Sequence, residues 1–202
     1  MTEPVLEIPA PPTRDRMDDD TLVTLFQSGD TQAFRILVER HKERVRNLVY
    51  SILNTPGIVD DLAQEVFIKV YDALPNFRFD SSFYTWVYRI TVNRCRDEIR
   101  KRKVRKLLPL HLLMENHDSE LLARTIVHPK DGETAALIEK SLQTLPEKFR
   151  LPVILKDIDG LAYEEIAEVL QCELGTVKSR LSRGRAMMRK VLAPLIDGDV
   201  NT

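Results

Sequence analysis

The sequence predicts an all-α protein made of two small helical domains joined by a linker. Apolar residues recur at helical spacing over most of the chain, and this pattern weakens only between about residues 107 and 133. No segment shows the apolar and polar alternation that is typical of a strand. With 202 residues, of which 43% are hydrophobic and 30% charged, the chain is long enough for two packed cores.

The first domain is expected over residues 18–106, after a proline-rich and flexible tail at 1–17. Apolar faces at helical spacing predict helices near residues 19–28 and 31–53. The Asn-Thr-Pro-Gly cluster at 54–57 contains two helix breakers, so the second helix should end there.

A third amphipathic helix follows and should end by residue 74. Asp60 or Asp61 is its expected N-cap, because a short carboxylate accepts hydrogen bonds from the first free backbone N–H groups of a helix. Its second face is acidic and polar, which by itself indicates only a solvated helix. A loop of aromatic and small residues at 76–82 then leads into a fourth helix at 83–106.

Residues 107–133 are the expected linker, since prolines and polar residues interrupt their apolar pieces. Helical spacing returns in the second domain at 134–196, which precedes a short tail at 197–202. Pro152 falls inside one of these helices and should bend it, because proline lacks the backbone N–H and crowds the preceding turn.

The strongest local motif runs from Tyr163 to Ser182 and has helix-turn-helix spacing. Ile166 on its first helix can pack against Val177 on its second. The second helix then has a basic outer face, with six Lys and Arg residues and no acid between residues 176 and 192. Such a face fits a DNA major groove, and the plainer interpretation is a solvated basic helix.

A second basic segment lies at residues 89–106, where nine Lys and Arg residues accompany only Asp97 and Glu98, although the net charge of the chain is −1. Aromatic residues precede it, and this mixture suits unpaired nucleotides, because rings stack on bases while cations follow phosphates. Helical spacing assigns some apolar residues here to the core: Phe83, Trp86, Val87 and Ile90. Tyr84 and Tyr88 remain as aromatic ligand candidates.

Taken in order, these motifs resemble the extracytoplasmic-function sigma factors of the sigma-70 family, over about residues 18–104 and 134–196. Asp-Leu-Ala-Gln-Glu-Val-Phe at 61–67 is similar to the polymerase-binding helix of that family, and residues 82–93 are similar to its promoter-melting segment. Motifs within 159–180 are similar to its second DNA-binding domain. The envelope-stress type of enteric bacteria is the most similar.

The resemblance implies a factor that binds core RNA polymerase, directs it to specific promoters and promotes DNA melting in a stress or envelope response. The core-polymerase contacts that it implies are Asp61, Leu62, Gln64, Glu65, Ile68, Lys69 and Asp72. The contacts that it implies to the downstream (−10) promoter element are Phe77, Arg78, Asp80, Ser81, Ser82, Tyr84, Asn93, Arg96 and Arg100. The contacts that it implies to the upstream (−35) element are Thr176, Lys178, Ser179, Ser182, Arg183 and Arg185.

Three positions depart from the family pattern or from helix preferences. Phe79 stands where the family commonly has glycine, which could alter the base pocket. Ala162 replaces the serine that would form a capping box with Glu165, a loss of about 1 kcal/mol. Gly184 in the last helix costs about 1 kcal/mol relative to alanine, and it either eases approach to a phosphate or has no role.

The sequence also bears on a regulating partner, on location and on other classes of function. The resemblance implies an anti-sigma protein as a partner, and the sequence predicts a cytoplasmic protein with no signal peptide, no membrane insertion and no small-molecule substrate. A helix-turn-helix repressor or activator is the nearest alternative, because the second domain alone fits it. An enzyme is a weaker one, since the four histidines have no metal-ligand spacing with the two cysteines. We therefore predict no catalytic residues, metal or cofactor.

Overall fold

A computed structural model describes residues 16–107 and 132–197 of the chain, with side chains for 16–105 and 137–193. These residues form helices and contain no strand, which confirms the predicted fold class. The α-helices are α1 (Asp19–Gln27), α2 (Thr31–Leu53), α3 (Val59–Ala73), α4 (Phe83–Leu107), α5 (Gly132–Thr144), α6 (Glu147–Val153), α7 (Tyr163–Leu170) and α8 (Leu174–Asp197). Most of the predicted linker lies outside the described residues.

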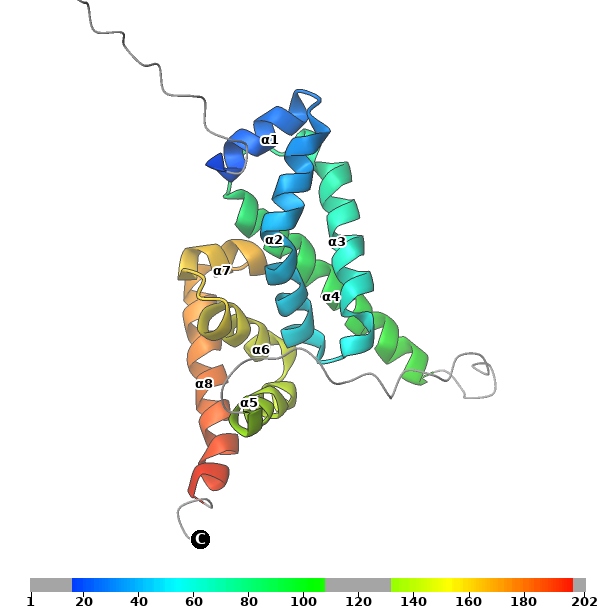
Figure 1. The fold of residues 1–202 in the computed structure, drawn as a ribbon. Helices are drawn as coiled ribbons and strands as arrows, with labels where there is room; N and C mark the ends of the chain where they lie inside the picture. The colour runs from blue at the N-terminus through cyan, green and yellow to red at the C-terminus, as the bar shows by residue number, and fades with distance from the viewer. Residues whose placement is uncertain (1–15, 108–131, 198–202) are drawn as a thin grey trace, which may run out of the picture.

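In the first bundle, α2 is the central helix, and α1, α3 and α4 pack against it (Figure 1). Val45, Leu48 and Ile52 on its inner face are fully buried, as their helical spacing predicts. Asp18 caps α1, where its Oδ1 accepts a hydrogen bond from the Thr21 N–H at 2.8 Å. The sequence thus determines both the buried face of this bundle and the start of its first helix.

The N-terminus of α3 differs from the prediction. A 3-10 turn at Pro56–Ile58 precedes α3, and Ile58 occupies the N-cap position without a side-chain hydrogen bond. The prediction that Asp60 or Asp61 caps this helix is wrong, because the turn starts the helix early and places both residues in its first turn. Their carboxylates still interact favourably there with the helix dipole.

In the second bundle, α8 packs along α5, α6 and α7. Pro152 lies near the end of α6, and the chain widens directly after it into a π-helical turn, η5 (Ile154–Ile158), so the regular α-helical hydrogen bonding ends beside this proline. A Cβ atom on Gly184 would lie 2.7 Å from Val153 Cγ2 and 2.9 Å from the Phe149 carbonyl oxygen. Gly184 therefore lets α8 approach α6 closely, which is neither of the two roles that the sequence suggested for it.

The two bundles contact each other. In Figure 1, α7 lies beside α4, and η5 also reaches α2. The Tyr50 hydroxyl donates to Glu139 Oε2 at 3.1 Å, and the Arg96 guanidinium donates to Glu147 Oε1 at 3.1 Å. These two hydrogen bonds join α5 and α6 to the first bundle, while α7 of the helix-turn-helix unit contacts the basic helix α4.

Candidate nucleic-acid and polymerase interfaces

The loop before α4 is fixed at both of its ends. The side-chain amide of Gln27 donates to the carbonyl oxygens of Leu74 at 3.0 Å and Phe77 at 2.9 Å. At the other end, the Ser82 hydroxyl accepts a hydrogen bond from the Thr85 N–H at 3.1 Å, as an N-cap residue does. These bonds hold the intervening residues in one geometry although most of their side chains are exposed.

An aromatic cluster supports this loop. Phe77 is 8% exposed, and its ring centroid lies 4.9 Å from that of Trp86 and 5.0 Å from that of Phe79. Phe83 is fully buried behind them. Phe77, a predicted −10 contact, is therefore mainly a supporting residue here, whereas Phe79 is 42% exposed.

A hollow of about 640 Å³ lies between this loop, α4 and α7. Four of the predicted −10 contacts line it, namely Phe77, Arg78, Asp80 and Ser81. Trp86, which the sequence assigned to the core, is half-buried and lines it too. The complete lining is Ala73, Asn76, Phe77, Arg78, Asp80, Ser81, Trp86, Arg89, Glu168 and Gln171. The last two come from the second bundle, and no sequence pattern predicts them at this site.

The structure separates the remaining −10 candidates into exposed and engaged side chains. Asn93 and Arg100 are exposed on α4, with Arg100 hydrogen-bonded to Asp97 one turn away. Arg96 is half-buried and holds Glu147 of the second bundle. Ser82 acts as the helix cap described above. Exposed polar groups of α4 thus lie next to others that join the two bundles.

Tyr84 and Tyr88 lie where the two bundles meet. Their ring centroids are 4.2 Å apart, and the Arg44 guanidinium lies 5.3 Å from the Tyr84 ring centroid. Tyr88 is 1% exposed and donates a hydrogen bond to Asp159 Oδ1 at 3.3 Å. Tyr88 therefore presents no surface to a ligand in this arrangement, because the second bundle covers it.

Asp159 is the most perturbed acid at this contact. Burial raises its pKa to about 6, against the weaker opposing effects of the Tyr88 hydrogen bond and the Arg44 charge. Burial and the nearby Asp159 charge raise the pKa of Tyr88 above its usual range. Asp159 Oδ2 is buried with no hydrogen-bond partner among the described residues. The contact thus contains a carboxylate whose ionised form is poorly solvated.

The outer face of α3 carries the predicted polymerase contacts. Six of the seven are exposed there: Asp61, Gln64, Glu65, Ile68, Lys69 and Asp72. Leu62 is removed from this surface, because its position on the apolar stripe buries it in the core. Tyr71, which the sequence argument did not select, is exposed beside Ile68. The surface therefore combines acidic, polar and apolar groups.

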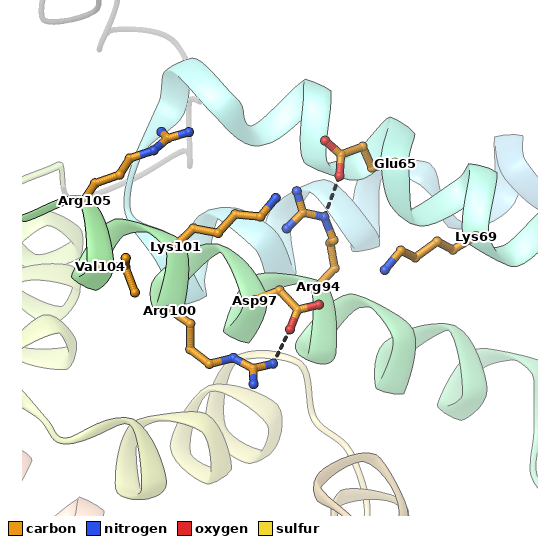
Figure 2. A pocket seen from close by; sticks show the side chains of 8 residues that line it. All are labelled: Glu65, Lys69, Arg94, Asp97, Arg100, Lys101, Val104 and Arg105. Atoms are coloured by element: carbon orange, nitrogen blue, oxygen red, sulfur yellow. Dashed lines mark hydrogen bonds and ion pairs between the residues drawn. The ribbon is translucent and has the colours of Figure 1, made fainter. Parts of the chain in front are cut away.

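A groove of about 710 Å³ separates α3 from the C-terminal half of α4. Figure 2 shows Arg94 reaching from α4 to Glu65 on α3, where Nε and Oε2 are 2.5 Å apart. This hydrogen bond is the main cause that lowers the pKa of Glu65. The complete lining is Glu65, Lys69, Arg94, Asp97, Arg100, Lys101, Val104 and Arg105. Sequence reasoning missed Arg94, although it belongs to the basic segment at 89–106.

The helix-turn-helix motif forms as predicted. Ile166 and Val177 are fully buried between α7 and α8, whereas the exposed predicted −35 contacts on the outer side of α8 are Lys178, Ser179, Ser182 and Arg183. Thr176 is half-buried, and Arg185 is hydrogen-bonded through Nε to Asp157 at 3.0 Å. Of the two arginines, Arg183 is therefore the better placed for DNA.

The start of α7 has half of a capping box. The Glu165 carboxylate accepts a hydrogen bond from the Ala162 N–H at 2.7 Å. Ala162 has no side-chain oxygen with which to accept the second bond, as the sequence indicated.

No helix in the described ranges is long and apolar enough to cross a bilayer. Within these same residues, no group of three or more His, Cys, Asp and Glu side chains is arranged to hold a metal ion.

Comparisons with known proteins agree with this organisation. The family described as Sigma-70 region 2 matches residues 37–105, and the family described as Sigma-70, region 4 matches residues 135–188. The chain is 37% identical over 188 residues to the ECF RNA polymerase sigma-E factor of Escherichia coli strain K12, with 90% of this chain and 98% of that protein covered. It is also 37% identical over 187 residues to the RNA polymerase sigma-H factor of Pseudomonas aeruginosa, with 88% and 95% covered.

Among solved structures, CnrH in complex with the cytosolic domain of CnrY is similar with a TM-score of 0.65 and 27% identity. The similarity covers 90% of this chain and 99% of CnrH. The fold and both surfaces thus define a two-domain transcription factor of the sigma type. The chain belongs to the extracytoplasmic-function group of the sigma-70 family.

Proposed function

We propose that this protein binds core RNA polymerase, directs it to specific promoters and promotes opening of the DNA there. The observation that best supports this function is that one chain has both an aromatic hollow beside the basic helix α4 and an exposed helix-turn-helix. A factor that only bound duplex DNA would not need a site suited to unpaired bases. The relatives named as RNA polymerase sigma factors support the same conclusion.

Core polymerase would bind the outer face of α3. Asp61 and Gln64 are exposed and available for polar contacts, and Ile68 supplies apolar area with 54% of its surface exposed. Mixed apolar and polar patches of this kind are typical of protein interfaces. Glu65 is less available, because it neutralises the buried Arg94.

The loop at 76–82 and α4 would hold the −10 element as a single strand. Trp86 offers a ring face with Phe77 packed against it, while Arg78 and Arg89 line the same hollow and can neutralise phosphates. A base extruded from the duplex could therefore be held by stacking and by polar contacts together. Exposed Asn93 on α4 would extend this surface.

The outer side of α8 would read the −35 element in the major groove. Lys178 and Arg183 are exposed there and can bond base edges or phosphates. The opposite side of α8 packs on α6 and α7, which fixes its orientation.

The two bundles would have to separate for both elements to be read at once. Packed helices lie about 8–10 Å apart, so α8 is within about 20 Å of α4 through α7. Elements some 25 base pairs apart are separated by roughly 85 Å of DNA at about 3.4 Å per base pair. The 24 residues between α4 and α5 can span at most about 86 Å, which makes the separation feasible.

We also propose an anti-sigma protein as the regulating partner, and action by binding in the cytoplasm rather than by catalysis. CnrH was solved with the cytosolic domain of a second protein, CnrY, and the family resemblance implies a comparable partner here.

The test of polymerase binding compares Asp61→Ala/Gln64→Ala with wild type by fluorescence titration of labelled protein with core polymerase. Glu39→Ala on α2 is the matched control, since it removes an exposed carboxylate from another face. We expect at least tenfold weaker binding for the double variant, as for the loss of roughly 1.4 kcal/mol, and no change for the control. Failure of the wild-type protein to bind core polymerase would favour the repressor or activator.

A further inference from the structure

Phe79 has an unusual backbone conformation for an aromatic residue. Three residues other than glycine have positive φ in the described chain: Asn54, Phe79 and Gln171. Asn54 and Gln171 are C-cap residues of α2 and α7, where the left-handed conformation is common. Phe79, with φ of 60°, caps no helix, and its Cβ makes this conformation costly.

Packing in the folded chain compensates little for this conformational energy. The Phe79 side chain remains 42% exposed, and its ring contact among the described residues is the edge-on one with Phe77 at 5.0 Å. Glycine would adopt the same backbone without strain, and asparagine would tolerate it. An exposed ring in a strained position therefore indicates a function for the ring itself.

The surroundings of Phe79 indicate what that ring would bind. Its neighbours Arg78 and Asp80 line the hollow described above. The Phe79 ring contacts Phe77, and Phe77 in turn contacts Trp86 inside the hollow, so a line of aromatic rings leads from the surface into the site. Bases stack on such rings whatever their identity, while nearby guanidinium groups neutralise the phosphates.

We propose that Phe79 stacks on a nucleotide next to the one held in the hollow. This stacking increases the affinity for the unpaired −10 strand and does not select among the bases. This inference rests on the proposed function. Removing the ring should therefore change two properties in opposite directions. It should relieve the loop backbone, which favours stability, and it should weaken DNA binding.

The experiment uses the full chain assembled with core polymerase and a fluorescent single-stranded oligonucleotide that carries the −10 element of a promoter selected by transcription. Wild type is compared with Phe79→Gly and Phe79→Asn, which remove the ring, and with Phe79→Tyr, which keeps it. We expect about tenfold weaker binding for the first two, near wild-type binding for Phe79→Tyr, and an equal or higher melting temperature for Phe79→Gly.

A series of oligonucleotides with one abasic position identifies direct stacking. At the position that Phe79 contacts, removing the base should weaken binding of the wild-type protein. On the oligonucleotide that lacks this base, Phe79→Gly should bind no more weakly than wild type. The role of Phe79 would be overturned if Phe79→Gly bound the intact oligonucleotide with wild-type affinity. It would also be overturned if Phe79→Gly weakened binding at every abasic position. Neither result would affect the proposed function. Absence of binding by the wild-type holoenzyme would overturn the proposed function as well.

Discussion

We predict that the contact between the two bundles depends on the charge of Asp159. Its carboxylate is buried against Tyr88, with Tyr84 on the same helix and Arg44 on α2 nearby, and Oδ2 has no hydrogen-bond partner among the described residues. Asp159→Asn keeps an acceptor oxygen for Tyr88 and removes the charge. Tyr88→Phe is the opposite perturbation, because it removes the donor and leaves the charge in place.

The size of the effect follows from the pKa. The pKa of Asp159 is about 6 in the closed arrangement and 3.8 in its ordinary state, a difference worth about 3 kcal/mol, or roughly a hundredfold. A raised pKa means that the closed arrangement binds the proton more tightly, so closure is most favourable below pH 3.8 and loses this advantage as the pH rises through 6. Lowering the pH from 7.5 to 5.0 should therefore favour closure of the wild-type protein about tenfold.

Small-angle X-ray scattering measures this equilibrium. A compact chain of 202 residues has a radius of gyration of about 17 Å, and separated bundles give a larger value. We expect the wild-type protein to become more compact at pH 5.0, Asp159→Asn to be compact at both pH values, and Tyr88→Phe to be more extended than wild type at pH 7.5. A pH response of Asp159→Asn equal to that of wild type would show that Asp159 does not control closure.

Three further predictions concern α7 and α8. Gly184→Ala should destabilise the protein by about 1–3 kcal/mol in urea unfolding despite the better helix propensity of alanine, because the added Cβ meets α6; equal or greater stability would contradict the packing argument. Ala162→Ser should raise the unfolding free energy by about 1 kcal/mol by completing the capping box, and an unchanged urea midpoint would count against this. Arg183→Ala should weaken −35 binding of the holoenzyme and lower the slope of log affinity against log salt by about 1, whereas Arg185→Ala should have a smaller effect; the reverse order would show that the Asp157 contact does not hold Arg185.

Much of the fold could be predicted because it depends on local periodicity. The buried residues of α2 and the pairing of Ile166 with Val177 follow from helical spacing, which a single sequence shows directly. The start of α3 could not be predicted, because a 3-10 turn at Pro56–Ile58 replaced the expected side-chain cap. Leu62 was assigned to a surface that its own apolar spacing excludes.

The contacts between the bundles had no signal in the sequence. Tyr88 and Asp159 are 71 residues apart, and neither belongs to a pattern that indicates the other. Gly184 was similarly ambiguous, since a glycine in a helix shows its role only when the neighbouring helix is seen. Arg94 could have been recognised only as one cation among nine, although it is the one that reaches Glu65. Side chains that act between distant elements thus require the three-dimensional structure.

Transcription in vitro from a genomic promoter library, with core polymerase and this protein as the only specificity factor, tests the sigma-factor function. We expect initiation at a defined set of promoters, lost with Asp61→Ala/Gln64→Ala and reduced with Arg183→Ala. Absence of initiation, together with tight binding of the free protein to duplex DNA, would contradict this function.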